Sequence, residues 1–116
     1  MVEDEPVVRR YVVTLLEGLK YTVRAVSNGE AALEALGRME HIDLLLFGVV
    51  LPGHFSGPRL AQEIVRRRPE IRVVFMSGYA EDVRWAEGSS WPIDALLHKP
   101  FRKASLARKI RATLDA

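Results

Sequence analysis

The sequence contains no cysteine, which excludes disulfides, thiol catalysis and cysteine metal sites. Long hydrophobic runs are also missing. The longest, residues 44–51, is interrupted by Gly48 and stopped by Pro52, far short of the ~20 residues that a membrane helix needs. The acidic run at positions 3–5 stands where a signal peptide would carry positive charge. We therefore expect a cytoplasmic protein that does not enter a membrane.

The sequence also lacks a large excess of either charge, because the formal net charge is only +2 over 116 residues. Basic residues cluster in Arg66–Arg68 and near the C-terminus, but a solvated helix face explains them without nucleic acid. The composition, 48% hydrophobic and 28% charged, is that of a globular protein. We expect residues 1–116 to form one domain with a packed core.

Short apolar runs alternate with amphipathic segments along the whole chain, which predicts a parallel sheet with covering helices. After a first strand of which only Met1 and Val2 are present, strands are predicted at residues 21–26, 44–47, 72–76 and 94–98. Helices are predicted from Pro6 onward, from an Asn28 cap onward, from about Leu60 to before Pro69, at residues 81–87 and at residues 105–114.

The first predicted strand is a stub compared with the others. Either the sequence begins within that strand, or residues outside the sequence supply the rest of it. The sheet is expected to be weaker at this position.

Ligands of doubly wound parallel sheets bind at the carboxyl ends of the strands, so the informative residues are expected there. Glu3 and Asp4 follow the first strand, Gly48 the third, Ser77 the fourth and Lys99 the fifth. A pair of acids, a hydroxyl and a lysine at one edge could together hold a divalent cation and a phosphate-sized anion. Each residue alone has an ordinary structural explanation, and only their combination is specific.

With these residues in place, the whole chain resembles the receiver domains of bacterial response regulators, most closely the C-terminal receiver of hybrid sensor histidine kinases. The resemblance implies an α/β fold of the flavodoxin-like (βα)5 type, a three-layer sandwich with parallel strand order 2-1-3-4-5. The segments that carry it are residues 2–6, 43–57, 75–79 and 99–101, together with 106–111 for the kinase subgroup.

By position, the resemblance implies that Glu3 and Asp4 correspond to the magnesium-binding pair, Ser77 to the hydroxyl switch and Lys99 to the phosphate-binding lysine. The phospho-acceptor aspartate of the family falls on Gly48, which has no side chain.

This departure bears directly on chemistry. Phosphoryl transfer to the domain needs a carboxylate oxygen in line with the donor, and neither Phe47 nor Val49 supplies one. Mg²⁺ loses one hard oxygen ligand, so we expect magnesium binding to be weak. With one carboxylate missing, Lys99 could instead neutralise Glu3 or Asp4 in a static ion-pair network.

The aromatic switch position of many receivers falls on Leu96, so an aromatic rotamer switch is in doubt, while Tyr79 is either a signalling or a packed loop residue. Expected partners are a histidine kinase or another signalling protein. A homodimer could form through the helix at 81–87, the strand at 94–98 and the helix at 105–114.

Three hypotheses follow. The first is a pseudo-receiver, not an enzyme, that acts through protein contacts. The second is an ordinary phospho-accepting receiver in which Gly48 is an engineered or sporadic change, or in which another residue accepts the phosphoryl group. The third, a flavin- or nucleotide-binding enzyme, is disfavoured because the acids at positions 3–5 would repel a phosphate after the first strand.

Overall fold

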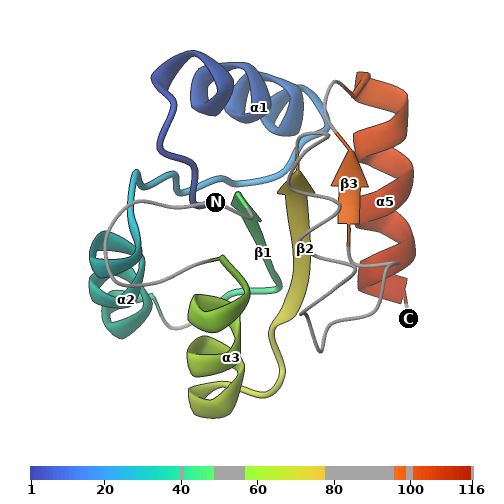
Figure 1. The fold of residues 1–116 in the computed structure, drawn as a ribbon. Coiled ribbons are helices and arrows are strands. Elements are labelled where there is room, and N and C mark those ends of the chain that lie inside the picture. The colour runs from blue at the N-terminus through green and yellow to red at the C-terminus, as the bar shows by residue number, and fades with distance from the viewer. Residues whose placement is uncertain (40, 49–56, 78–95, 99–100, 116) are drawn as a thin grey trace.

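The computed structural model describes residues 1–116 except 40, 49–56, 78–95, 99–100 and 116 (Figure 1). In chain order its elements are α1 (Pro6–Gly18), α2 (Gly29–Arg38), β1 (Leu44–Gly48), α3 (Gly57–Arg67), β2 (Arg72–Ser77), β3 (Leu96–His98) and α5 (Lys103–Asp115). The helix predicted at 81–87 lies outside the described residues.

The sheet is parallel, with β2 between β1 and β3. Phe47 pairs with Phe75, and Phe75 with Leu96. On the other side of β1, Val2 forms isolated parallel bridges to Phe47 and Val26. The resulting order, Val26, Val2, β1, β2, β3, agrees with the predicted order 2-1-3-4-5, and the first strand is as short as predicted.

The strand predicted at residues 21–26 is wrong for residues 21–25, because only Val26 makes a β-bridge. A strand needs a neighbouring strand to pair with, and on this side of the sheet the only bridge that the structure describes is the one between Val2 and Val26. Val26 exchanges hydrogen bonds with Met1 and Glu3: its N–H donates to the Met1 carbonyl at 2.9 Å, and its carbonyl accepts from Glu3 at 3.1 Å. The apolar pattern of these residues is therefore present without the regular pairing.

Helix starts follow the sequence signals closely. Pro6 occupies the first turn of α1, where its missing N–H leaves no bond unmade. Asn28 caps α2 as predicted, since its Oδ1 accepts a hydrogen bond from the Ala31 N–H at 2.8 Å. Glu5 occupies the cap position of α1, but its side chain makes no capping bond there.

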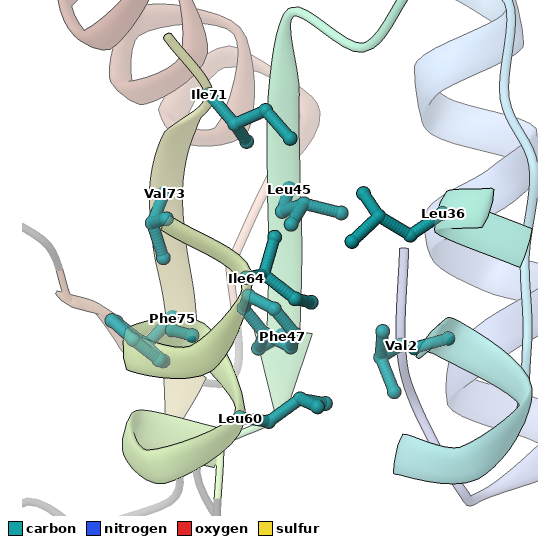
Figure 2. Close-up of a cluster of buried hydrophobic side chains, with 11 residues drawn as sticks. Val2, Leu36, Leu45, Phe47, Leu60, Ile64, Ile71, Val73 and Phe75 are labelled. Carbon is teal, nitrogen blue, oxygen red and sulfur yellow. The ribbon is translucent and has the colours of Figure 1, made fainter. Parts of the chain in front are cut away.

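Two clusters of buried side chains lie on opposite faces of the sheet, which makes the fold a three-layer sandwich as predicted. One cluster joins the sheet to α2 and α3 (Figure 2), and within it the Phe47 and Phe75 rings stack with centroids 5.7 Å apart. The other cluster joins the sheet to α1 and α5 and includes Leu16 and Ile110. β1 and β2 alternate their residues between the two layers.

Candidate functional site

The carboxyl ends of the parallel strands meet at one edge of the sheet, and three predicted site positions are brought together there. Val2 is paired with Phe47, so Glu3 follows beside Gly48 in the next row. Gly48 pairs with Met76, and Ser77 is the next residue of β2. The geometry therefore supports the predicted grouping of Glu3, Gly48 and Ser77 at backbone level.

The structure describes the side chains of only some of the predicted site residues. Leu96 and Ser77 lie in β3 and β2, but the structure describes only their places in the strands. Lys99 and Tyr79 lie outside the described residues. The predicted contact of Lys99 with the acids and the roles of Tyr79 and Leu96 therefore remain predictions.

Glu3 is the charged residue of this edge that the fold buries, with only 2% of its surface exposed. Its Oε2 accepts a hydrogen bond from the Glu5 N–H at 3.1 Å. A buried carboxylate needs such donors, because it has lost most of its contact with water. Glu3 thus closes the turn into α1, the role that a capping residue would otherwise play. Asp4, next in the chain, is exposed.

Arg9 is a residue of this edge that sequence reasoning missed. From the first turns of α1, its Nη1 donates to the Glu3 carbonyl at 2.9 Å and to the Asp4 carbonyl at 3.4 Å. The guanidinium of Arg9 thus binds the backbone of the acidic segment, while the Glu3 side chain is bound by the N–H of Glu5 in the same segment. A basic residue one turn after an acidic segment was the available signal, but such spacing is common on solvent-exposed helices.

Gly48 is buried and forms part of the regular ladder. Its N–H donates to the Val2 carbonyl at 2.9 Å, and it pairs with Met76. Extended strand backbone is accessible to every residue type except where proline interferes, so the backbone conformation at this position does not require glycine. The consequence is chemical: the end of β1 offers no side-chain oxygen.

Mg²⁺ requires oxygen ligands in a near-octahedral arrangement. Across the described ranges, no group of three or more histidine, aspartate or glutamate side chains could hold a metal ion. Glu3 and Asp4 supply two carboxylates, and one Glu3 oxygen already accepts a backbone hydrogen bond. The described residues thus do not complete a magnesium site.

The basic run at positions 66–68 is paired within the protein. Arg66 and Arg67 both bind the Glu63 carboxylate, at 2.8 and 2.9 Å, and the hydrogen bond from Arg66 holds the pKa of Glu63 below its ordinary value. Arg68 Nη1 donates to the Met39 carbonyl at 2.7 Å and to the Leu36 carbonyl at 3.4 Å. Arg66 and Arg67 thus have a partner on an exposed helix face, whereas Arg68, which follows α3, binds the backbone at the end of α2.

None of the helices in the described part of the chain is long and apolar enough to cross a membrane.

Comparison with known proteins agrees with the fold. Residues 1–111 match the family described as Response regulator receiver domain. The chain is 36% identical over 119 residues to the sensor kinase CckA of Brucella abortus, a match that covers 99% of this chain but only 12% of that protein. It is 34% identical over 117 residues to the response regulator receiver protein CpdR of the same species, which covers 100% of this chain and 95% of CpdR.

Solved structures show the same architecture. A crystal structure of a response regulator receiver protein from Sinorhizobium medicae superposes with a TM-score of 0.86 at 27% identity, covering 99% of this chain and 91% of that one. A CheY-like receiver domain from Methanospirillum hungatei, at 24% identity and a TM-score of 0.79, supports the fold alone. The flavodoxin-like α/β fold predicted from the sequence is therefore confirmed.

Domains of this family act in two-component signalling with histidine kinases and other signalling proteins, and they commonly bind Mg²⁺ at their phosphorylation site. From its fold, its strand-end residues and these matches, the chain belongs to the response regulator receiver domain family.

Proposed function

We propose that this chain is a pseudo-receiver, a module of a two-component phosphorelay that acts through protein contacts and does not accept a phosphoryl group at position 48. The observation that carries the proposal is the end of β1. Gly48 lies there beside Glu3 and Met76, buried in the ladder, and presents no carboxylate. Transfer of a phosphoryl group requires a positioned nucleophilic oxygen, which a glycine does not supply.

The rest of the proposal follows from the same edge. Magnesium binding is weak, because Glu3 and Asp4 lack a third carboxylate from position 48. The module has no enzymatic activity of its own and does not bind nucleic acid directly, consistent with the internal pairing of Arg66 and Arg67. The module is cytoplasmic, and its partner is a histidine kinase or another signalling protein, as the similarity to a segment of a sensor kinase suggests.

A direct test is incubation of the chain with acetyl phosphate and Mg²⁺ at neutral pH, followed at once by intact-protein mass spectrometry. We expect no species heavier by one phosphoryl group. A small-molecule donor is chosen so that a negative result cannot be attributed to the wrong kinase. A stoichiometric adduct on the unaltered chain would show that the proposal is wrong.

The matched variants are Gly48→Asp and Gly48→Asn. Their side chains have nearly the same shape, but the first carries a carboxylate and the second a neutral amide. In Gly48→Asp, a carboxylate oxygen can attack the phosphorus of acetyl phosphate, form an acyl phosphate and release acetate. We expect an adduct labile to hydroxylamine in this variant alone. Circular dichroism of both variants establishes that they are folded before the masses are compared.

Thermal unfolding with and without Mg²⁺ gives an independent readout of the same site. Any ligand that binds only the folded state raises the midpoint by mass action. The midpoint of Gly48→Asp is expected to rise with added Mg²⁺, whereas those of the unaltered chain and of Gly48→Asn change little.

The alternative is an ordinary receiver in which position 48 is a sporadic change or another carboxylate accepts the phosphoryl group. Asp4, exposed at the same edge, is the described carboxylate that a donor could reach. Under this alternative the unaltered chain gains a hydroxylamine-labile adduct that Asp4→Asn removes.

A further inference from the structure

Three consecutive acids, Glu3, Asp4 and Glu5, form the turn that leads into α1. Carboxylates this close repel one another unless a positive group lies beside them. Glu3 is buried, so water screens its charge less than it screens an exposed charge. A positive group at this turn therefore stabilises the folded chain, and the described residues do not complete a magnesium site that would hold one.

Arg9 brings such a positive group to the turn. Its Nη1 donates to the Glu3 carbonyl at 2.9 Å and to the Asp4 carbonyl at 3.4 Å. Arg9 is itself half-buried, so its charge acts on the acidic segment with less screening than a charge on the open surface. The guanidinium thus combines a nearby positive charge with two hydrogen bonds to the backbone of the acids.

The two carbonyls that Arg9 binds lie just before the hydrogen-bond ladder of α1. At the start of that ladder, the Arg9 N–H donates to the Glu5 carbonyl at 2.9 Å. The carbonyls of Glu3 and Asp4 precede this bond, so they depend on a donor from outside the ladder. Carbonyl and carboxylate oxygens are also the hard ligands that Mg²⁺ prefers. At this turn, two such oxygens are bound by the guanidinium.

The remaining bonds of the turn also come from the chain itself. The Glu5 N–H donates to Glu3 Oε2 at 3.1 Å, and the Glu3 N–H donates to the Val26 carbonyl at 3.1 Å. The acidic segment is therefore bound through its amides, through one carboxylate and through two carbonyls. None of these contacts requires a divalent cation.

We propose that Arg9 is a built-in counterion of the acidic segment, and that its guanidinium holds residues 3–5 in the turn into α1 in place of a bound divalent cation. Arg9 acts through the backbone of Glu3 and Asp4, so it is a positioning residue. The turn then keeps one arrangement whether or not Mg²⁺ is present. The inference rests on the proposed function in one respect, the weak magnesium binding that follows from Gly48.

The test uses three variants of the full chain. Arg9→Met keeps a long side chain but removes the charge and the donors, and Arg9→Lys keeps the charge. Arg10→Met is the matched control, because Arg10 is the next residue of α1, is exposed and has no side-chain hydrogen bond among the described residues. Amide exchange at Glu5 and the midpoint of thermal unfolding are measured in EDTA, in millimolar Mg²⁺ and in NaCl of equal ionic strength. Circular dichroism establishes which variants are folded.

In the unaltered chain, we expect Mg²⁺ to change neither readout more than NaCl does. Arg9→Met is expected to speed Glu5 exchange in EDTA by about tenfold, because the loss of charge-assisted hydrogen bonds loosens the turn. Mg²⁺ is expected to slow that exchange again by at least about threefold, since the freed oxygens are ligands that it accepts. Arg9→Lys is expected to lose less protection and to gain no response to Mg²⁺. Arg10→Met should behave like the unaltered chain.

Unchanged Glu5 exchange in Arg9→Met would overturn the inference. Faster exchange that Mg²⁺ slows no better than NaCl would also overturn it, because Arg9 would then be a structural contact alone. The same response to Mg²⁺ in Arg10→Met would assign the effect to net charge and contradict a specific role of Arg9. If Arg9→Met is unfolded in EDTA, it is expected to fold on addition of Mg²⁺, and failure to do so counts against the proposal.

These measurements use no phosphoryl donor, so their outcome is separate from that of the phosphorylation test. An adduct on the unaltered chain would contradict the proposed function and leave the role of Arg9 intact. Loss of the Mg²⁺ response in Arg9→Met would contradict the role of Arg9 and leave the proposed function intact.

Discussion

The amino group of Met1 is an ionisable group that the fold places among apolar residues. It donates a hydrogen bond to the Arg24 carbonyl at 2.8 Å, and Met1 belongs to the cluster between the sheet and α1 and α5. Burial lowers the pKa of this amino group from 8.0 to about 6, because desolvation penalises the ammonium form. The folded state therefore holds this proton less tightly than the unfolded chain does.

The stability of the chain with a free amino group at Met1 is expected to increase as pH rises from 6 to 8. Below pH 6 the group is charged in both states and the full penalty applies, and above pH 8 it is neutral in both states. Two pKa units correspond to roughly 2–3 kcal/mol at most. Urea unfolding at several pH values measures the effect.

Acetylation of the Met1 amino group provides the control, because it removes this titration while leaving every histidine in place. The acetylated chain should lose the extra rise between pH 6 and 8. An identical rise in both chains would assign it to other groups.

At the scale of elements, the end of α1 is formed by a residue type that rarely adopts the required conformation. Lys20 has a φ of 73°, in the left-handed region. Its N–H donates to the Glu17 carbonyl at 3.0 Å and the Tyr21 N–H donates to the Leu16 carbonyl at 3.1 Å. This pair of bonds defines a Schellman ending, in which glycine is the preferred residue at this position.

Lys20→Gly is expected to stabilise the chain by about 1 kcal/mol, because a non-glycine residue in the left-handed region carries a cost of order 1–3 kcal/mol. Chemical denaturation of the variant measures the change. Lys20→Ala keeps the conformational cost and removes the charged side chain, so it should change stability little. If alanine stabilises as much as glycine does, the backbone explanation is wrong.

At the scale of the whole molecule, the sheet separates two cores that share no residue. Ile71 belongs to the cluster with α2 and α3, and Ile110 to the cluster with α1 and α5. Both side chains are 3% exposed. We therefore expect Ile71 and Ile110 to contribute to stability independently.

Ile71→Val and Ile110→Val are each expected to cost about 0.5–1.5 kcal/mol, the usual effect of removing one buried methyl group. Because the sites share no partners, the double variant should cost the sum within about 0.5 kcal/mol. Equilibrium denaturation of the three variants completes the cycle. A coupling energy above about 1 kcal/mol would contradict independent cores.

Periodicity and turn chemistry predicted much of this architecture. The runs at 44–47 and 72–76 became β1 and β2, each one residue longer, and Asn28 capped α2. Residues 21–25 failed to form a strand because pairing depends on a neighbour that a local pattern does not reveal.

The candidate site was only partly predictable for a similar reason. Glu3 and Gly48 could be placed at one edge because strand ends in a parallel sheet coincide, and the bridges of Val2 support this. The bonds from Arg9 to the acidic segment depend on side-chain direction, which residue type alone does not determine. The left-handed conformation of Lys20 could not be predicted, because the residue that usually indicates such a helix ending is glycine.

The hydrogen bonds from Arg68 to the Leu36 and Met39 carbonyls tie the end of one helix to the chain that leaves another. Helix ends normally fray one at a time, since their last carbonyls depend on water. Here the α2 carbonyl of Leu36 and the following carbonyl of Met39 depend on a guanidinium that follows α3. Unwinding at either terminus would break the same bonds, so we expect the two termini to open and close together.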